Sequence, residues 1–168
     1  DSTSVNAYIN RAMSRRMLKD YTNSMKDYNI AIRLKPDQIE LYTSRANLKF
    51  DMNDYDGSIS DFDLAIRMNP KYTTAYTNRA MVKKANNDLH GALEDYNKAL
   101  ELDPGNNEFY NNRGNLKFQL NDFQGAIDDY TASIRKNPKD FLGYKNRGVL
   151  QFSRKHYNDA LADLTEGI

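Results

Sequence analysis

The sequence predicts an all-α protein, an α-solenoid of five stacked antiparallel helical hairpins. Its four prolines, Pro36, Pro70, Pro104 and Pro138, are spaced 34 residues apart. Within each interval, apolar residues recur at helical spacing in two stretches separated by a short polar break. A fixed period of this length is typical of stacked supersecondary units, each of which buries its apolar face only against its neighbours.

Alignment on the prolines predicts a single array over residues 1–168. The repeats are 5–38, 39–72, 73–106, 107–140 and an incomplete 141–168. Position 4 of every repeat is a tyrosine, and positions 8 and 20 are small residues, as close contact between two helices requires. Each proline lacks an amide hydrogen, so it ends the second helix of its repeat and can begin the next.

The polar break between the two helices of a repeat contains pairs such as Asn53-Asp54 and Asn121-Asp122. Their side-chain oxygens can accept backbone N–H bonds at the start of a helix. We therefore expect the second helix of each repeat to begin directly after this pair.

Composition argues against several functions. The chain has 24 Lys and Arg against 23 Asp and Glu, so no strong field attracts nucleic acid. It has no cysteine, which excludes disulfides and thiolate metal sites and leaves the cellular compartment open. No apolar run approaches the roughly 18 residues of a membrane span, so we expect no membrane insertion. The sequence starts at Asp1 with neither an initiator Met nor the apolar run of a signal peptide, so we expect it to be a mature or excised piece of a protein.

The sequence contains no recognisable active site. The two histidines, His90 and His156, fall near turns of different repeats, without a second ligand at metal-binding spacing. Glycine-rich phosphate loops, serine elbows and zinc-binding histidine pairs are absent from the sequence. We therefore expect no enzymatic activity, no cofactor and no metal.

The repeat resembles the tetratricopeptide repeat family over residues 5–168. Tyrosine replaces the family's tryptophan at position 4, whereas the aromatic residue at position 24 is kept as Tyr28, Phe62, Tyr96 and Tyr130, with Leu164 in the last repeat. The resemblance implies a right-handed superhelix of helical hairpins that binds other proteins. It does not imply a particular activity.

Arginine replaces the family's leucine at position 7, and aspartate fills position 23 of every repeat. The arginines are Arg11, Arg45, Arg79, Arg113 and Arg147, and the aspartates are Asp27, Asp61, Asp95, Asp129 and Asp163. A guanidinium between helices is tolerated when a carboxylate accepts two parallel hydrogen bonds from it. We predict structural Arg–Asp pairs, within or between repeats; the alternative is a cationic ladder for phosphate or acidic peptides.

The resemblance implies a concave groove lined by positions 2, 5, 6, 9, 12 and 13 of the first helices. Asparagines there are Asn10, Asn47, Asn78, Asn111, Asn112, Asn115 and Asn146. A carboxamide both donates and accepts, which suits the backbone of an extended peptide; the alternative is a solvated polar face. Position 12 adds Phe50, Phe118 and Phe152 as peptide anchors or as packing residues.

The family's best-known ligand is an acidic C-terminal peptide held by lysines and asparagines. Position 2, which would carry such a lysine, is instead Asn6, Glu40, Thr74, Glu108 and Leu142. The cations that would neutralise a terminal carboxylate are therefore missing, and we do not expect a chaperone-tail adaptor.

We predict a protein–protein interaction scaffold that binds a peptide or protein segment in the groove. The alternatives are a structural element that forms a homo-oligomer and a substrate-recruiting module of a larger enzyme. Leu161, Leu164 and Ile168 have no following hairpin to cover them. We expect either that the natural chain continues beyond Ile168 or that this uncapped end meets another copy.

Overall fold

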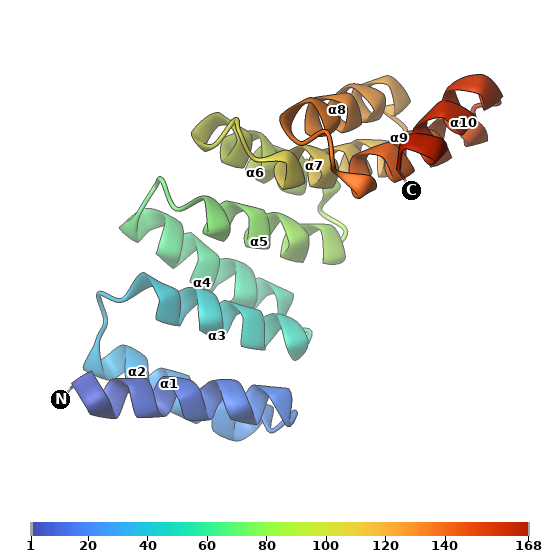
Figure 1. Ribbon diagram of the computed structural model, residues 1–168. Helices are drawn as coiled ribbons and strands as arrows, with labels where there is room; N and C mark the ends of the chain where they lie inside the picture. The colour runs from blue at the N-terminus through green and yellow to red at the C-terminus, as the bar shows by residue number, and fades with distance from the viewer. Residues whose placement is uncertain (1, 168) are drawn as a thin grey trace. The chain divides into compact units, whose positions relative to one another are not determined.

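The computed structural model describes residues 2–167, which form ten α-helices and no strand (Figure 1). The helices are α1 Ser2–Met17, α2 Tyr21–Leu34, α3 Ile39–Asp51, α4 Tyr55–Met68, α5 Thr73–Ala85, α6 Leu89–Leu102, α7 Asn107–Gln119, α8 Phe123–Lys136, α9 Phe141–Ser153 and α10 Tyr157–Glu166. The predicted all-α solenoid of helical hairpins is confirmed. Ile168, which we expected at an open apolar end, lies outside the described residues.

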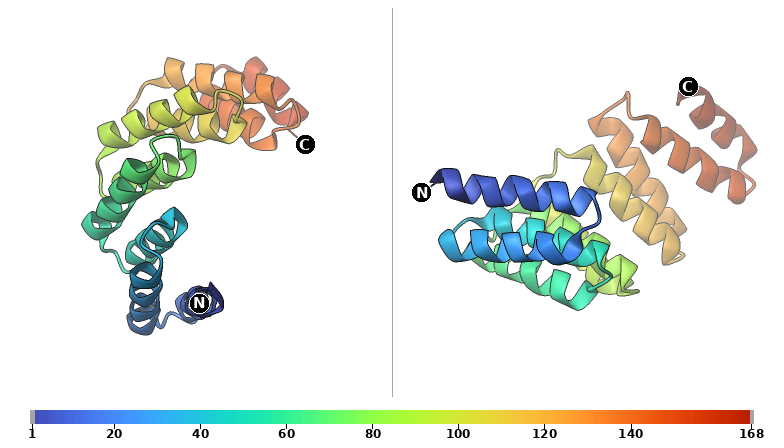
Figure 2. Two further views of the ribbon diagram at one scale, coloured as in Figure 1. Left: turned by 90° about the vertical axis from the view of Figure 1, so that its left-hand side faces the viewer. Right: turned by 90° about the horizontal axis from the view of Figure 1, so that it is seen from below.

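The chain divides into two compact units, Asp1–Asn86 and Asn87–Ile168. In the N-terminal unit α1 pairs with α2 and α3 with α4, and in the C-terminal unit α7 pairs with α8 and α9 with α10 (Figure 2). The first helix of a hairpin also packs against the helix before it, as α3 does on α2 and α9 on α8. The two helices of the third repeat, α5 and α6, belong to different units.

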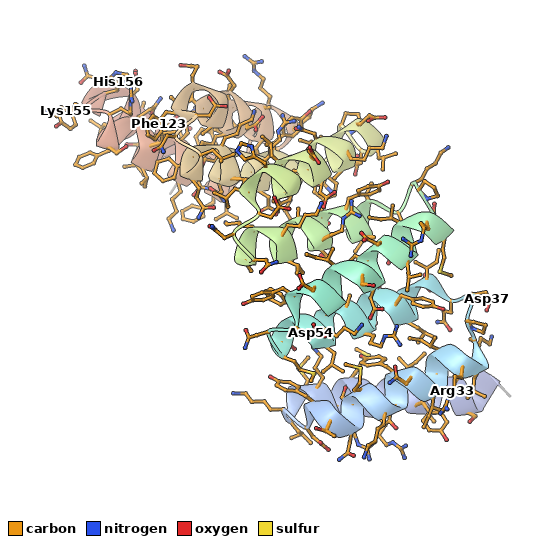
Figure 3. All side chains as sticks on the ribbon, turned by 180° about the vertical axis from the view of Figure 1, so that it is seen from behind. Arg33, Asp37, Asp54, Phe123, Lys155 and His156 are labelled. Carbon is orange, nitrogen blue, oxygen red and sulfur yellow. The ribbon has the colours of Figure 1, made fainter. Side chains whose placement is uncertain are left out.

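The second helix of a hairpin begins directly after a capping aspartate, as predicted for the second and fourth repeats. Asp54 accepts a hydrogen bond from the Gly57 amide at 3.0 Å, and Asp122 accepts one from the Gly125 amide at 3.0 Å. Both caps are thus confirmed. A β-carbon at Gly125 would lie 2.1 Å from the Asp122 carboxylate, so glycine leaves room for the cap. Figure 3 shows Asp54 and Asp37 at opposite ends of the N-terminal unit's helices.

The residue before each cap has a left-handed backbone. Asn53 and Asn121 both have φ of 61°, a region that asparagine enters more readily than most residues. They end the first helix and turn the chain into the cap, so their role differs from the capping role we expected. In the first and fifth hairpins this position is Lys19 and Lys155, with φ of 61° and 65°.

The apolar core of each unit follows the junctions between consecutive hairpins. Leu48 of α3 shares a buried cluster with Ala12 and Tyr28 of the hairpin before it. Leu150 of α9 shares one with Ala126 and Tyr130. Leu48 and Leu150 both occupy position 10, and Tyr28 and Tyr130 both occupy position 24, so these two junctions are closed by the same leucine–tyrosine contact.

The tyrosine at position 4 connects the second, third and fourth hairpins to the proline that precedes each of them. The Tyr42 hydroxyl donates to the Pro36 carbonyl at 2.8 Å, and Tyr76 donates to Pro70 at 3.3 Å. Because that carbonyl lies just beyond a helix end, the bond satisfies an acceptor that no helix can use.

No helix within residues 2–167 is both long and apolar enough to cross a membrane.

Replacing Asp122 by alanine removes the acceptor that caps α8. We expect the free energy of unfolding to fall by about 1 kcal/mol, measured by urea denaturation followed by circular dichroism. Glu94→Ala, which removes an exposed charge from α6, is the control and should change stability by less than about 0.5 kcal/mol. Equal stability of Asp122→Ala and the unchanged protein would refute the role of the cap.

Candidate functional site

Arginine and aspartate pair within a single repeat. Arg45 donates from Nε and Nη2 to the two Asp61 oxygens at 2.8 and 2.7 Å. The same two-bond geometry joins Arg11 to Asp27, Arg113 to Asp129 and Arg147 to Asp163. In the third repeat Arg79 and Asp95 belong to different units, so their pairing stays a prediction.

The same arginines also bind the preceding hairpin. Arg45 donates from Nη1 to the Asn29 side chain at 2.7 Å, and Arg147 donates to Thr131 at 2.8 Å. Arg113 donates to Asn97 and Arg79 to Asp63 in the same way. Three guanidinium nitrogens are therefore engaged in each of Arg45, Arg113 and Arg147, which leaves few donors for a bound anion.

A second cation, which the sequence analysis missed, binds the same aspartates. Lys49 lies 2.9 Å from an Asp61 oxygen, Lys117 lies 2.9 Å from an Asp129 oxygen, and Arg15 pairs with Asp27. These cations follow the position-7 arginine by four residues, a spacing that places both on one helix face. That spacing was the available signal. In the fifth repeat Gln151 takes this place, and its Oε1 has no hydrogen-bond partner.

The ion pairs are shielded from water on the aspartate side. The side chain of Asp61 is 2% exposed and that of Arg45 is 18% exposed. The guanidinium also lies over the ring of the position-4 tyrosine, 5.8 Å from its centroid in the case of Tyr42. In the first hairpin the hydrogen bond from Arg11 lowers the pKa of Asp27 below its ordinary value, against the effect of burial.

Asparagines at position 6 differ from these engaged polar groups. The side chains of Asn10 on α1, Asn78 on α5, Asn112 on α7 and Asn146 on α9 make no hydrogen bond to other described residues. Asn112 and Asn146 are half-buried, and their helices α7 and α9 contact each other directly. The C-terminal unit therefore presents two amides with unused donors and acceptors on adjacent helices.

Two other predicted groove asparagines are used inside the C-terminal unit. Asn111 is buried and donates to the Asp140 carboxylate. Asn115 accepts a hydrogen bond from the Tyr130 hydroxyl at 2.8 Å. Burial raises the pKa of Tyr130 to about 12, so the hydroxyl stays protonated as a donor. Asn47 lies half-buried on α3.

The phenylalanines at position 12 pair with an aromatic ring across the turn of their own hairpin. The ring centroids of Phe50 and Tyr55 are 5.8 Å apart, and those of Phe118 and Phe123 are also 5.8 Å apart. Phe152 lies 5.5 Å from Tyr157 with the rings edge to face. Phe50 is half-buried against a core cluster, whereas Phe118 and Phe152 remain exposed. The ring pairs therefore pack across the turns of the hairpins, and in the fourth and fifth repeats the position-12 ring stays accessible to solvent.

A buried carboxylate without a cationic partner lies between α8 and α9. Asp140 accepts hydrogen bonds from the Ser133 hydroxyl at 2.6 Å, the Leu142 amide at 3.2 Å and the Asn111 side chain. Burial opposes its ionisation, but the hydrogen bonds together hold the pKa of Asp140 below its ordinary value. Asn111 Oδ1 has no partner in this cluster. Within residues 2–167, no group of three or more acidic or histidine side chains is placed to hold a metal ion.

Comparisons with known proteins agree with this repeat geometry. A family model described as Tetratricopeptide repeat matches residues 5–38 and 39–72, and a second model with that description matches residues 108–140. A model described as TPR repeat matches residues 81–120. The chain belongs to the tetratricopeptide repeat family. No curated protein sequence matches it.

Several solved tetratricopeptide structures have a similar fold. MamA from Desulfovibrio magneticus RS-1 is 13% identical, with 98% of this chain and 93% of that chain covered and a TM-score of 0.82. A tetratricopeptide repeat protein from Parabacteroides merdae ATCC 43184 is 21% identical, with 99% and 66% covered and a TM-score of 0.84. YrrB, described as a TPR protein with an unusual peptide-binding site, is 19% identical, with 96% and 83% covered and a TM-score of 0.72. At these identities the similarity shows the fold alone.

Replacing Asp129 by asparagine leaves Arg113 and Lys117 without their counter-charge at a largely buried site of the tetratricopeptide fold. We expect the free energy of unfolding to fall by about 3 kcal/mol in urea denaturation. Glu101→Gln removes an exposed ion pair with Lys98 and should cost less than about 0.5 kcal/mol. Equal losses for the two variants would contradict the structural role of the buried pair.

The Asp140 carboxylate should make stability depend on pH. Because its folded-state pKa lies below the value in the unfolded chain, its ionisation stabilises the fold above about pH 4, and this stability is lost as pH falls through the folded-state pKa. Asp140→Asn cannot ionise, so its free energy of unfolding should fall less on acidification. Urea denaturation across a pH series measures this difference, and parallel pH profiles for the two proteins would argue against it.

Proposed function

We propose that this chain is a protein-interaction scaffold that binds an extended segment of a partner protein along the first helices of its repeats. The observation that carries the proposal is the asparagine at position 6, whose amide makes no hydrogen bond within the described residues at Asn10, Asn78, Asn112 and Asn146. Membership of the tetratricopeptide repeat family supports a protein partner. We also propose that the five repeats act as one array without a catalytic role.

The unused amides match the chemistry of a peptide backbone. Each carboxamide offers donors and an acceptor, so it can bind an N–H and a C=O of an extended chain whatever its side chains are. The other polar columns are already engaged, as Arg113 with Asp129 illustrates. A net hydrogen bond contributes about 1 kcal/mol, so two amides on adjacent helices contribute roughly 30-fold in affinity.

The surface around Asn146 indicates which peptide side chains would bind there. Leu142 and Val149 are exposed on α9, four residues before and three residues after Asn146, which places all three on one helix face. Lys145 is also exposed, beside the Phe141 ring. We propose that the C-terminal unit prefers an apolar peptide side chain flanked by unpaired backbone amides and carbonyls.

Peptides selected from a random displayed library on the intact protein should bind through Asn112 and Asn146. We expect the Asn112→Ala/Asn146→Ala variant to lose roughly 30-fold in affinity for these peptides, measured by fluorescence anisotropy. Asn158→Ala, which removes an exposed amide from α10, is the matched control and should bind normally.

The side-chain amide signals of Asn112 and Asn146 in nuclear magnetic resonance spectra should also shift when such a peptide is added. Peptides that bind the double variant as tightly as the unchanged protein would show that the position-6 asparagines form only a solvated surface.

A further inference from the structure

A recess between α2 and α3 in the N-terminal unit is bordered by cations. Its volume is about 550 Å³, which falls in the range of ligand-binding clefts. The residues that line it are Lys26, Asn29, Ile30, Ile32, Arg33 and Arg45. Three of them carry a positive charge, and the described lining residues include no carboxylate. The recess therefore has a cationic rim without a counter-charge of its own.

The polar residues of the rim share one face of α2. Lys26, Asn29 and Arg33 follow one another at intervals of three and four residues, the spacing of neighbours on a helix surface. Lys26 and Arg33 are two turns apart, so roughly 10 Å of helix axis separates them. Both are exposed, and Figure 3 shows Arg33 on α2 with Asp37 in the turn that follows. The rim thus presents two separate cations, which suits a ligand with two negative groups.

These polar groups are available to a ligand. Arg33 makes no hydrogen bond or ion pair with other described residues. The Lys26 ammonium donates only to the Asn23 side chain, over a long 3.4 Å at the exposed surface. Asn29 uses its oxygen to accept from Arg45 at 2.7 Å, and its side-chain N–H groups have no partner among the described residues. Arg45 is held by its own ion pair, so Lys26, Asn29 and Arg33 supply the donors.

The cationic rim is particular to the first junction and is not a property of the repeat. Position 22, which is Lys26 here, is Glu94 in the third repeat and Asp128 in the fourth. In the second repeat position 25 is Asp63, which accepts a hydrogen bond from Arg79. Each of the other junctions therefore has a carboxylate at one of these positions. Stacking of hairpins does not require three cations here, because the other junctions stack without them.

The recess also has an apolar wall. Ile30 and Ile32 are half-buried and line it, and Ile32 packs against a core cluster of the N-terminal unit. A free inorganic anion would leave this wall in contact with water. The phosphate backbone of a nucleic acid would also have no aliphatic group to place there. A segment of protein can carry carboxylates and an apolar side chain together, so it fits both parts of the recess.

We propose that this recess binds an acidic segment of a partner protein in which two carboxylates flank an apolar side chain. Alternate side chains of an extended chain point to the same side, so the pattern Glu-x-Leu-x-Glu places all three on one face over roughly 13 Å. The carboxylates pair with Lys26 and Arg33, and the leucine lies on the isoleucine wall. Asn29 donates to a backbone carbonyl of the segment. The site is separate from the groove around Asn112 and Asn146.

Peptides selected on the intact protein from a displayed Glu-x-Leu-x-Glu library provide the probe. We expect fluorescence anisotropy to show saturable binding that weakens as salt is added. Arg33→Glu should weaken binding about fivefold, because it removes one ion pair and introduces a like charge. Arg67→Glu is the matched control and should bind normally. It makes the same change of charge at the same repeat position of the second hairpin, where the side chain is also exposed.

Reversal of the charges tests the direction of the interaction. Peptides in which both glutamates are replaced by lysine should bind the Lys26→Glu/Arg33→Glu variant more tightly than they bind the unchanged protein. Replacing the peptide leucine by serine should weaken binding to the unchanged protein about fivefold, since the isoleucine wall then loses its partner.

Four outcomes would overturn the proposal. They are a library without binders, equal losses for Arg33→Glu and Arg67→Glu, a serine peptide that binds as tightly as the leucine peptide, and displacement of the peptide by inorganic pyrophosphate at a lower concentration than by unlabelled peptide. The last would identify a site for a small anion.

The Asn112→Ala/Asn146→Ala variant should bind the acidic peptides normally. Loss of their binding in that variant would place them in the groove and refute the proposal for the recess. Because the groove peptides are in turn indifferent to Arg33→Glu, the two proposals fail separately.

Discussion

The arginine at position 7 is the constraint on which the hairpins depend. Its planar guanidinium makes two parallel bonds to an aspartate of its own hairpin and a third to the preceding hairpin, as Arg45 shows with Asp61 and Asn29. A leucine at this position would pack through non-directional apolar contacts. The guanidinium instead makes directional hydrogen bonds, which fix the rotation of the first helix about its axis and its alignment with the preceding hairpin. The same residue thus specifies the fold of a hairpin and its stacking.

The buried aspartates require more than one cation because of what surrounds them. Asp61 and Asp129 each lie beside an arginine and a lysine from one helix, so every complete cluster carries a net positive charge. The partly exposed arginine and lysine side chains keep contact with water and limit the cost of that charge. The near-neutral charge of the whole chain therefore conceals a regular internal arrangement of ion pairs.

Local periodicity allowed the fold to be predicted, because prolines, small residues and caps act within a few positions of themselves. Local periodicity could not predict which aspartate each arginine binds. That choice depends on whether the second helix of the same repeat or that of a neighbouring repeat lies closer to the arginine. Asn111 and Asn112 illustrate the same limit for the candidate site. They are adjacent in sequence, yet a rotation of about 100° per residue turns one toward Asp140 and leaves the other accessible. The partner Asp140 occupies a position that is not aspartate in any other repeat.

The left-handed turn residue has a consequence for the order of folding. Asparagine at Asn53 and Asn121 accommodates a positive φ well, whereas Lys19 and Lys155 hold the same backbone with a residue less suited to it, at roughly 1 kcal/mol or more. Repeat arrays nucleate where local stability is greatest and grow by adding neighbours. Folding should therefore begin in the interior hairpins and reach the first and fifth last. For the same reason, we expect the first and fifth hairpins to open before the others in the folded protein.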